Sequence, residues 1–432
     1  MKRSVSEYLS RGGTSLVTPK GMGDLLPPEA AERRALSRSV LRSFELAGYE
    51  LVTPPVFEHA DVVARGNDSV EDRDLLRFVE PESGEVAVLR PDITPQVARI
   101  VATQLPDRPP PYRLCYEGRV FRRRSGRARS HRQITQAGLE CIGLPGVAAD
   151  TEVVSLAARA LESVGLQEFR IELSDIRLVR SLLLQVPDEA RASATAAVAQ
   201  KDGALLETIL HNAGAGKTIG RRLCSLIDAY GDRAVLRDAR RRFRWDVAKD
   251  ALDGLAALTD RLEALGLSER IGFDLADTRG LAYYTGVHFT LLAHGPGEAL
   301  GAGGRYDNLL SNFEMDAPAT GFALDLRNLQ WTLRNAGIAG PNDHPLRLVV
   351  GGGGSAALDV CDRLRAAGIV AATLETTNAK ACLAFARAWG YDAALVLSRG
   401  KARLTRASDD STHGLGAGDL ADPERVRTLC RG

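Results

Sequence analysis

The sequence predicts an α+β fold with an antiparallel-sheet core, a helical insertion and a small C-terminal α/β domain. Short β-rich runs separated by proline or polar turns indicate the antiparallel sheet. The β pattern disappears at 186–265, where Ala, Leu, Arg and Asp recur at helical spacing, so this section is expected to be an all-helical insertion. Strand and helix patterns alternate after residue 346. We therefore expect two domains, 1–340 and 346–432, joined by the polar segment 342–345.

The core is expected to begin with a helix over 30–47, because apolar side chains recur there at helical spacing. Pro27 and Pro28 precede this helix and Gly48 ends it. A strand that runs to Thr53 should follow. An amphipathic helix is expected over 150–164. The expected strands of the core sheet are 86–89, 112–121, 135–142, 270–274 and 287–292.

The C-terminal domain is expected to have the order βαβαβ, which favours parallel strands. The expected strands are 346–350, 369–374 and 393–397, and the expected helices are 356–367 and 379–389.

Composition indicates an ordinary soluble globular protein, with 44% apolar and 26% charged residues in 432. The net charge of +1 gives no general attraction to a polyanion. Six scattered cysteines form no C-x-x-C pair, so neither a zinc site nor a disulfide framework is indicated. Residues 1–13 lack the apolar core of a signal peptide, and no run of about 18 apolar residues occurs. We expect a cytoplasmic protein that does not enter membranes.

Two glycine-rich stretches resemble nucleotide-binding loops only superficially. The segment 214–218, Gly-Ala-Gly-Lys-Thr, has His211 where a P-loop needs its first glycine, and no strand pattern leads into it. The segment 351–354 lies between a predicted strand and a predicted helix, but it lacks the spaced third glycine of a dinucleotide site. We interpret the second stretch as a tight βα turn.

A set of polar residues matches the chemistry of a free amino acid. Such a ligand carries an ammonium, a carboxylate and a side chain, so its site needs acceptors, a cationic donor and hydroxyls. Arg279-Gly280-Leu281-Ala282-Tyr283-Tyr284-Thr285-Gly286 supplies an Arg and two phenols, and 301–307, Gly-Ala-Gly-Gly-Arg-Tyr-Asp, is interpreted as a glycine-lined turn beside them. The candidate binding residues are Asp92, Thr94, Gln136, Glu140, Arg279, Tyr283 and Tyr284.

These segments resemble the histidine-recognition segments of class II histidyl-tRNA synthetases. The resemblance continues through 19–21 with Asp24, 89–96 (Leu-Arg-Pro-Asp-Ile-Thr-Pro-Gln) and 121–122. It implies that Asp92, Thr94 and Gln136 surround the α-amino group of histidine. It also implies that Glu140, Arg279 and the two tyrosines orient its carboxylate and ring. The alternative is a scaffold whose polar pocket has decayed or been reused.

The resemblance fails at the positions that serve the nucleotide. Arg122 of motif 2 is kept and is a residual phosphate-binding candidate, but Arg124 stands where the family has Glu. Asn328 stands where motif 3 has its phosphate-binding Arg, Ala282 replaces an Asp, and Thr135 replaces a His. Loss of one such charged group removes a factor of roughly 10²–10³ in rate. We expect no catalytic residues, no metal and no cofactor.

The pattern is similar to that of the regulatory subunits of ATP phosphoribosyltransferase. That resemblance implies a short catalytic subunit as partner, histidine as effector, and a homodimer, formed around residues 53–55, within a hetero-oligomer. The C-terminal domain resembles a degenerate anticodon-binding domain. Histidyl-tRNA synthetase and a stand-alone histidine-binding paralogue remain as alternatives. An Arg-rich run at 119–132 is as well explained by a solvated loop or subunit contact as by phosphate binding, so nucleic acid is not an expected partner.

Overall fold

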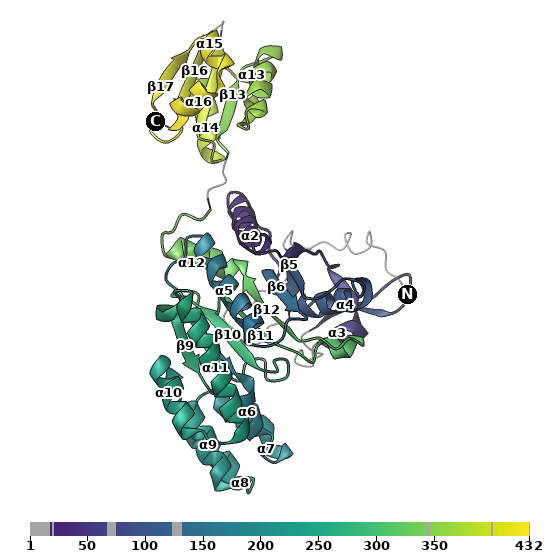
Figure 1. Ribbon diagram of the computed structural model, residues 1–432. Helices are drawn as coiled ribbons and strands as arrows, with labels where there is room; N and C mark the ends of the chain where they lie inside the picture. The colour runs from purple at the N-terminus through teal and green to yellow at the C-terminus, as the bar shows by residue number, and fades with distance from the viewer. Residues whose placement is uncertain are drawn as a thin grey trace, which may run out of the picture. The chain divides into compact units, whose positions relative to one another are not determined.

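The computed structural model describes residues 18, 19, 21–66, 75–122, 132–341, 345–398 and 401–431. The chain divides into two compact units, 1–341 and 342–432 (Figure 1).

The first unit is built on a long mixed sheet whose strand order within the described residues is β1-β5-β6-β12-β11-β10-β7-β9-β8. Most neighbours are antiparallel, and only the pairs β1–β5 and β7–β9 are parallel. The bounds are β1 Glu50–Leu51, β5 Tyr112–Phe121, β6 Gln133–Ile142, β7 Arg170–Asp175, β8 Tyr230–Gly231, β9 Ile271–Asp274, β10 Val287–Leu292, β11 Gly301–Arg305 and β12 Ala319–Asp325.

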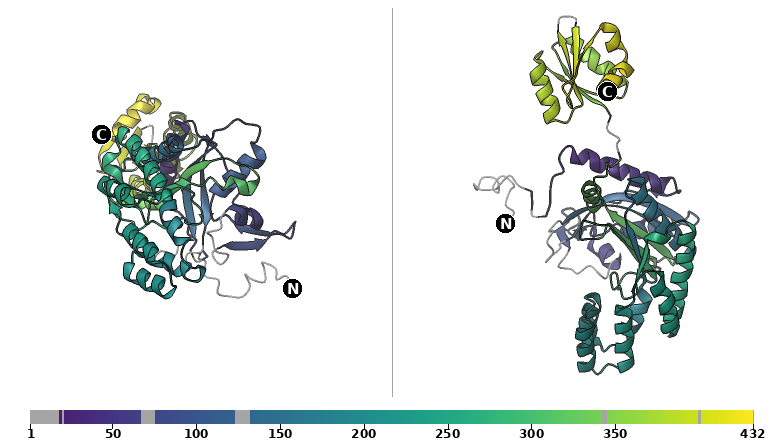
Figure 2. Two further views of the ribbon diagram at one scale, coloured as in Figure 1. Left: turned by 60° about the horizontal axis from the view of Figure 1, so that its bottom comes forward. Right: turned by 90° about the vertical axis from the view of Figure 1, so that its left-hand side faces the viewer.

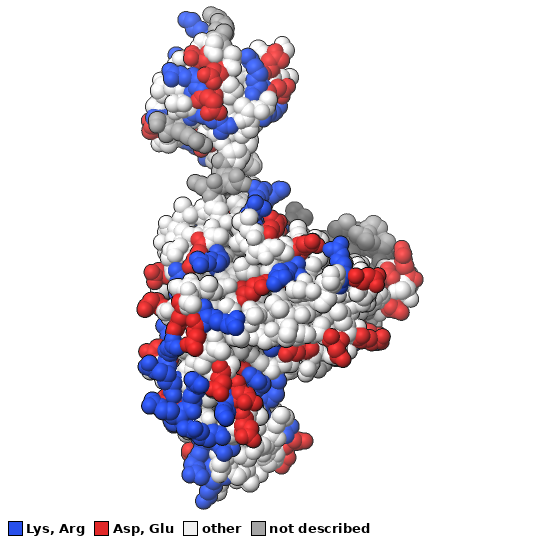
Figure 3. All heavy atoms as spheres, in the orientation of Figure 1, with Lys and Arg blue, Asp and Glu red and all other residues white. Residues whose placement is uncertain are grey.

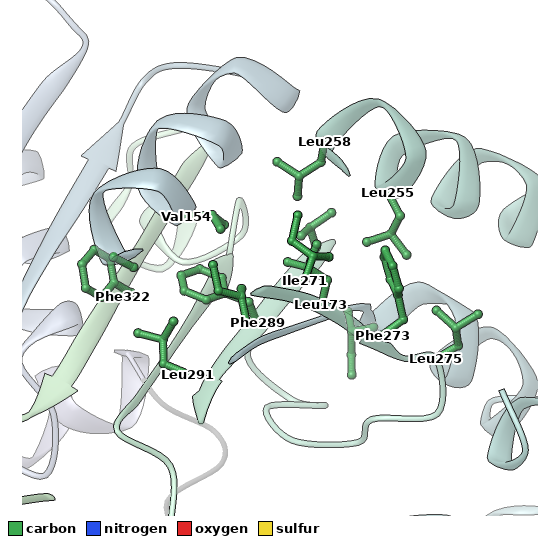
Figure 4. Packing of buried hydrophobic residues seen from close by; sticks show 14 of the residues in the cluster. Val154, Leu173, Leu255, Leu258, Ile271, Phe273, Leu275, Phe289, Leu291 and Phe322 are labelled. Carbon is green, nitrogen blue, oxygen red and sulfur yellow. The ribbon is translucent and has the colours of Figure 1, made fainter. Parts of the chain in front are cut away.

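Three helices cover one face of this sheet, namely α2 Glu29–Glu45, α5 Val147–Ser163 and α11 Asp246–Ala264. Alternate strand residues point to this face, as the two-residue period of a strand requires. Phe289 of β10 and Phe273 of β9 pack there against Val154 of α5 and Leu255 of α11 (Figure 4). Apolar burial on this face fixes which strand residues are left to point to the other face.

The opposite face carries a second apolar cluster, in which Val97 of α4 packs with Tyr116 of β5 and with Tyr306. The elements here are α4 Thr94–Gln104 and η3 Leu310–Phe313, with a separate three-stranded sheet made of β2 Phe57–His59, β4 Val86–Leu89 and β3 Leu76–Val79. Between β2 and β3 the chain forms α3 Ala60–Gly66, and α12 Leu326–Asn335 follows β12. The polar side chains of Gln136 and Glu140 on β6 also point to this face.

The insertion is a set of helices beyond the β8 edge of the sheet (Figure 1). They are α6 Ile176–Leu183, α7 Asp188–Ala199, α8 Gly203–Asn212, α9 Lys217–Ile227 and α10 Arg233–Arg242, followed by α11 and then η2 Ser268–Arg270. Lys and Arg gather over this region (Figure 3), where residues 217–249 contain ten of them against four Asp or Glu. Several are ion-paired, for example Arg240 with Asp253 at 2.6 Å.

The second unit has a five-stranded sheet in the order β14-β13-β15-β16-β17, with helices on both faces (Figure 2). The three strands β14, β13 and β15 are parallel, as the βαβαβ pattern predicts. The bounds are β13 Arg347–Gly351, α13 Ser355–Ala366, β14 Val370–Leu374, α14 Ala379–Ala388, β15 Ala393–Ser398, β16 Lys401–Arg406, β17 Thr412–Leu415, α15 Ala417–Ala421 and α16 Pro423–Arg431. The antiparallel strands β16 and β17 were not expected.

Four details of the sequence interpretation are wrong. The glycine-rich segment at 301 is strand β11, not a turn, because it lies between β10 and β12, where a Cβ at Gly303 would lie 2.4 Å from Gly321 O. β4 belongs to the small sheet and not to the core sheet. β7 was missed. The insertion includes the short strand β8, so it is not all helical.

Of the helices in the described ranges, none has the length and apolar character needed to span a bilayer.

Candidate functional site

The candidate residues of β6 lie on the face of the sheet covered by α4. Gln136 and Glu140 are four residues apart on this strand, so they project from the same face. Gly138 lies between them, and a Cβ there would come within 2.6 Å of Tyr116 Oη. The absence of a side chain at Gly138 therefore lets the Tyr116 ring lie over the strand and reach Glu140.

Glu140 is the centre of a buried network of hydroxyl groups. Thr94 donates its hydroxyl to Glu140 Oε1 at 2.6 Å, Tyr116 donates to the same oxygen at 3.1 Å, and Tyr306 donates to Oε2. Burial raises the pKa of Glu140 to about 8, although these hydroxyls favour the carboxylate. Asp92 nearby adds to the rise. The carboxyl group thus joins α4, β5, β6 and the segment after β11.

Gly321 of β12 is required by this network. It pairs with Glu140 across the two strands, and a Cβ at 321 would fall on the Glu140 carboxyl group. The same Cβ would lie 2.6 Å from Tyr306 Oη. Any larger residue at this position would displace the buried carboxyl group or the phenol.

Two buried polar atoms on the Glu140 face of the sheet have no hydrogen-bond partner among the described residues, Gln136 Oε1 and Tyr283 Oη. The Tyr283 ring lies 5.1 Å from Tyr306 and 5.4 Å from Tyr284, measured between ring centroids. Leaving a buried polar group unsatisfied costs about 1–3 kcal/mol. One acceptor and one phenol are therefore available to a ligand that carries complementary groups.

Asp92 and Arg122 are paired with each other at the entrance to this region. Arg122 Nη2 lies 3.1 Å from Asp92 Oδ2, and Arg122 Nε donates to Pro91 O at 2.6 Å. Asp92 also accepts from the Ile93 backbone N–H at 2.8 Å. The charge of Arg122, expected to contact phosphate, is thus balanced by Asp92.

Arg90 fixes the loop that carries Asp92 and Thr94. It is 4% exposed and donates to the carbonyl groups of Arg119 and Pro54, both at 2.8 Å. The bonds tie the loop to β5, and a Cβ at Gly118 would collide with the Arg90 guanidinium.

Arg279 is already engaged by two carboxylates. Its Nε donates to Asp277 at 2.9 Å, and its Nη2 lies 2.7 Å from Asp277 Oδ2 and 2.8 Å from Glu172 Oε1. Burial alone would raise the pKa of Asp277, but His288 and Arg279 more than offset it and hold that pKa below its ordinary value. A ligand carboxylate would have to compete for this guanidinium.

The loop with the two tyrosines is anchored from outside the pocket. Arg180 of α6 donates Nη2 to the carbonyl groups of Leu281 and Tyr284, the latter at 2.6 Å. The Tyr284 ring stacks on His288 at a centroid distance of 5.4 Å.

All seven predicted residues therefore lie in one region of the first unit, although Arg279 and Asp92 are occupied by protein partners. Sequence reasoning missed Tyr116, Tyr306, Asp277 and Arg180. Tyr306 lies within the glycine-rich motif, and Asp277 comes two residues before Arg279, so the sequence carried a signal for both.

Of the positions at which the resemblance to synthetases fails, Asn328 and Thr135 are turned away from the pocket, whereas Ala282 lies in the loop that carries Tyr283 and Tyr284. Asn328 is 5% exposed and donates Nδ2 to Ala299 O at 3.0 Å. Arg327 beside it is exposed, and its charge acts on Arg33 of α2. Thr135 points to the α2 face of β6, away from Gln136. Arg124 lies outside the described residues. Within the described ranges, no three His, Cys, Asp or Glu side chains are placed to hold a metal.

Residues 21–329 match the family model of histidyl-tRNA synthetase. The chain is 40% identical over 316 residues to an ATP phosphoribosyltransferase regulatory subunit of Moorella thermoacetica, covering 73% of this chain and 81% of the relative. It is 38% identical over 345 residues to one of Anaeromyxobacter dehalogenans, covering 78% and 97%. A crystal structure from Bacillus halodurans, described as an ATP phosphoribosyltransferase regulatory subunit/histidyl-tRNA synthetase, is 27% identical with a TM-score of 0.76, covering 87% and 96%.

The raised pKa of Glu140 predicts a pH-dependent difference between the wild-type protein and Glu140→Gln. A carboxyl group whose pKa is raised from 4.5 to about 8 on folding stabilises the fold fully at low pH and loses that contribution as pH rises toward 8. The wild-type free energy of unfolding should therefore fall relative to Glu140→Gln between pH 5 and 8, by at most about 1.4 kcal/mol per pH unit. Urea denaturation at four pH values measures this. Glu168→Gln, at an exposed position, is the matched control, and a Glu140→Gln difference that is constant with pH would contradict the assignment.

Proposed function

Because the chain belongs to the family of ATP phosphoribosyltransferase regulatory subunits, which has the class II histidyl-tRNA synthetase fold, we propose that it is a non-catalytic subunit that activates a short catalytic subunit and transmits feedback inhibition by histidine. The observation that carries the proposal is the contrast between the two sides of the ancestral site. Buried polar atoms are available on the amino-acid side, whereas on the nucleotide side Asn328 is locked to the backbone.

The amino-acid side suits a zwitterion with an imidazole. Gln136 Oε1 is an unpartnered acceptor for an ammonium, and Tyr283 Oη can donate to a carboxylate or accept from a ring N–H. Glu140 adds a carboxyl group whose pKa of about 8 allows either protonation state near neutral pH. These buried polar groups support histidine as the effector.

The nucleotide side supports the proposed absence of aminoacyl-adenylate chemistry. The resemblance to synthetases places the motif 3 Arg at position 328, where this chain has a buried neutral amide bonded to Ala299 O. Arg122, the remaining cation of motif 2, is balanced by Asp92. Phosphoryl and adenylyl chemistry depends on positive groups placed against developing negative charge, and neither residue offers an unpaired one.

Feedback requires that histidine bind more tightly to one conformation of the complex than to another. The loop with Tyr283 and Tyr284 contacts the pocket on one side and is held through Arg180 to the helical insertion on the other. A ligand that orders this loop would therefore act on α6 as well as on the sheet. We propose this connection as the route from the pocket to the subunit surface.

Reconstitution tests the role of the chain. Mixing it with a short-form ATP phosphoribosyltransferase catalytic chain should give a complex that elutes as one species and forms phosphoribosyl-ATP faster than the catalytic chain alone. Size-exclusion chromatography with light scattering, followed by assay of the peak, measures both. Separate elution at micromolar concentrations with no gain in rate would leave the stand-alone paralogue as the better interpretation.

Tyr283→Phe tests the pocket as the histidine site. The change removes only a hydroxyl that lacks a protein partner, so the protein should remain as stable as wild type or become slightly more stable. Loss of one hydrogen bond to the ligand, about 1–1.5 kcal/mol, should raise the histidine concentration for half inhibition of the reconstituted enzyme roughly 5- to 12-fold.

The matched control is Tyr230→Phe, whose hydroxyl lies on a side chain that is 65% exposed in the insertion. Histidine should inhibit the complex that contains Tyr230→Phe at the same concentration as it inhibits the wild-type complex. If histidine inhibits the Tyr283→Phe complex at the wild-type concentration as well, histidine binds elsewhere, for example on the catalytic subunit.

A further inference from the structure

A buried histidine, His288, lies against Tyr284 of the tyrosine loop (residues 277–286), and the proposed pocket assigns it no role. His288 of β10 is 1% exposed, and neither ring nitrogen makes a well-directed hydrogen bond to a described residue. Its Nε2 nevertheless lies 3.3 Å from Asp277 Oδ2, close enough for an ion pair when the ring is protonated. The Tyr284 ring stacks on the His288 imidazole at an interplanar angle of 11°.

The surroundings of His288 contain few charges. From the tyrosine loop the facing groups are Asp277, its partner Arg279, and Tyr284. From β7 the neighbour across the strands is Ser174, whose hydroxyl is also unpartnered, and Glu172 lies two residues further on the same face. From β11 the neighbour is Gly304. Arg305 points to the other face, where it pairs with Asp150 at 2.8 Å. Asp277 is therefore the carboxylate within ion-pair distance of the ring.

Asp277 links this histidine to the pocket arginine. It accepts the Arg279 backbone N–H and Nε, both at 2.9 Å, and is 7% exposed. If Arg279 turned to a ligand carboxylate, Asp277 would keep one backbone N–H and lose its cation. A buried carboxylate without a cation is strongly unfavourable. Glu172, the second partner of Arg279, is 27% exposed at its side chain, so water can take the place of the guanidinium there.

We propose that His288 is a positioning residue that takes up a proton when the pocket is filled, so that the protonated ring replaces Arg279 at Asp277 and releases the guanidinium to the ligand carboxylate. The inference rests on the proposed histidine pocket. It makes effector binding a proton-coupled exchange of partners, and it explains why a buried imidazole is placed 3.3 Å from a carboxylate that already has a cation. Binding should weaken as pH rises, because it takes up a proton from solution.

Isothermal titration of the full-length chain with L-histidine tests this, in two buffers of different ionisation enthalpy and between pH 6.5 and 8.5. Free histidine titrates in the same range, so the readout is the difference between wild type and His288→Gln. Wild type should take up close to one more proton per bound ligand. Its affinity should fall by up to tenfold more per pH unit than that of the variant.

Two further variants distinguish the proton-coupled exchange of partners from a merely structural role of His288. Asp277→Asn removes the carboxylate that needs a replacement cation, so the extra proton uptake should disappear there as well. His294→Gln, at an exposed histidine six residues further along the chain, should behave as wild type. Equal proton uptake by wild type and His288→Gln would overturn the proposal.

The coupling of His288 to Arg279 through Asp277 can also be tested if no form of the protein binds histidine. That result would reject the proposed effector site alone. The His288 ring resonance, identified by its absence in His288→Gln, is then followed by NMR against pH. In Arg279→Ala the ring should titrate at higher pH than in wild type, because Asp277 has lost its other cation. An unchanged titration would show that His288 and Arg279 are not coupled through Asp277.

Discussion

The buried carboxyl group of Glu140 is the constraint on which the rest of the site depends. Its desolvation is partly offset by hydroxyls that come from three separate segments, carried by Thr94, Tyr116 and Tyr306. The two phenols fit only because Gly138 and Gly321 have no side chain. The same strand places Gln136 on the same face, where Gln136 Oε1 and Tyr283 Oη are buried without partners among the described residues.

The amino-acid side and the nucleotide side of the site differ in the polar groups that they offer to a ligand. On one side, polar atoms without partners are buried around Glu140 and would be stabilised by a small polar ligand. On the other side, Asn328 is part of the backbone packing and Arg122 is neutralised by Asp92. A fold with unpartnered buried polar atoms on the amino-acid side, and with no unpaired cation at positions 122 and 328 on the nucleotide side, is suited to sensing an amino acid, and this is the physical basis of the proposed regulatory role.

Elements with a strong periodic pattern were predictable from the sequence, such as helix α5, strand β10 and the parallel strands of the second unit. Strand β11 was not predictable, because glycines favour turns locally. Its glycines are required here by the close approach of β10 and β12. β7 had the alternation of a half-buried strand in Ile171 and Leu173, and it was overlooked. The partners of the site residues were the least predictable, since Arg279 meets Glu172 across 107 residues of sequence.

We propose above all that this core binds histidine and has lost adenylate formation. The most direct measurement is ATP–pyrophosphate exchange, with Mg²⁺ and saturating ATP, on samples in which histidine binding is followed in parallel by calorimetry. We expect saturable histidine binding with exchange equal to that of a blank without protein. Exchange that rises above the blank with histidine concentration would contradict it and favour a histidyl-tRNA synthetase.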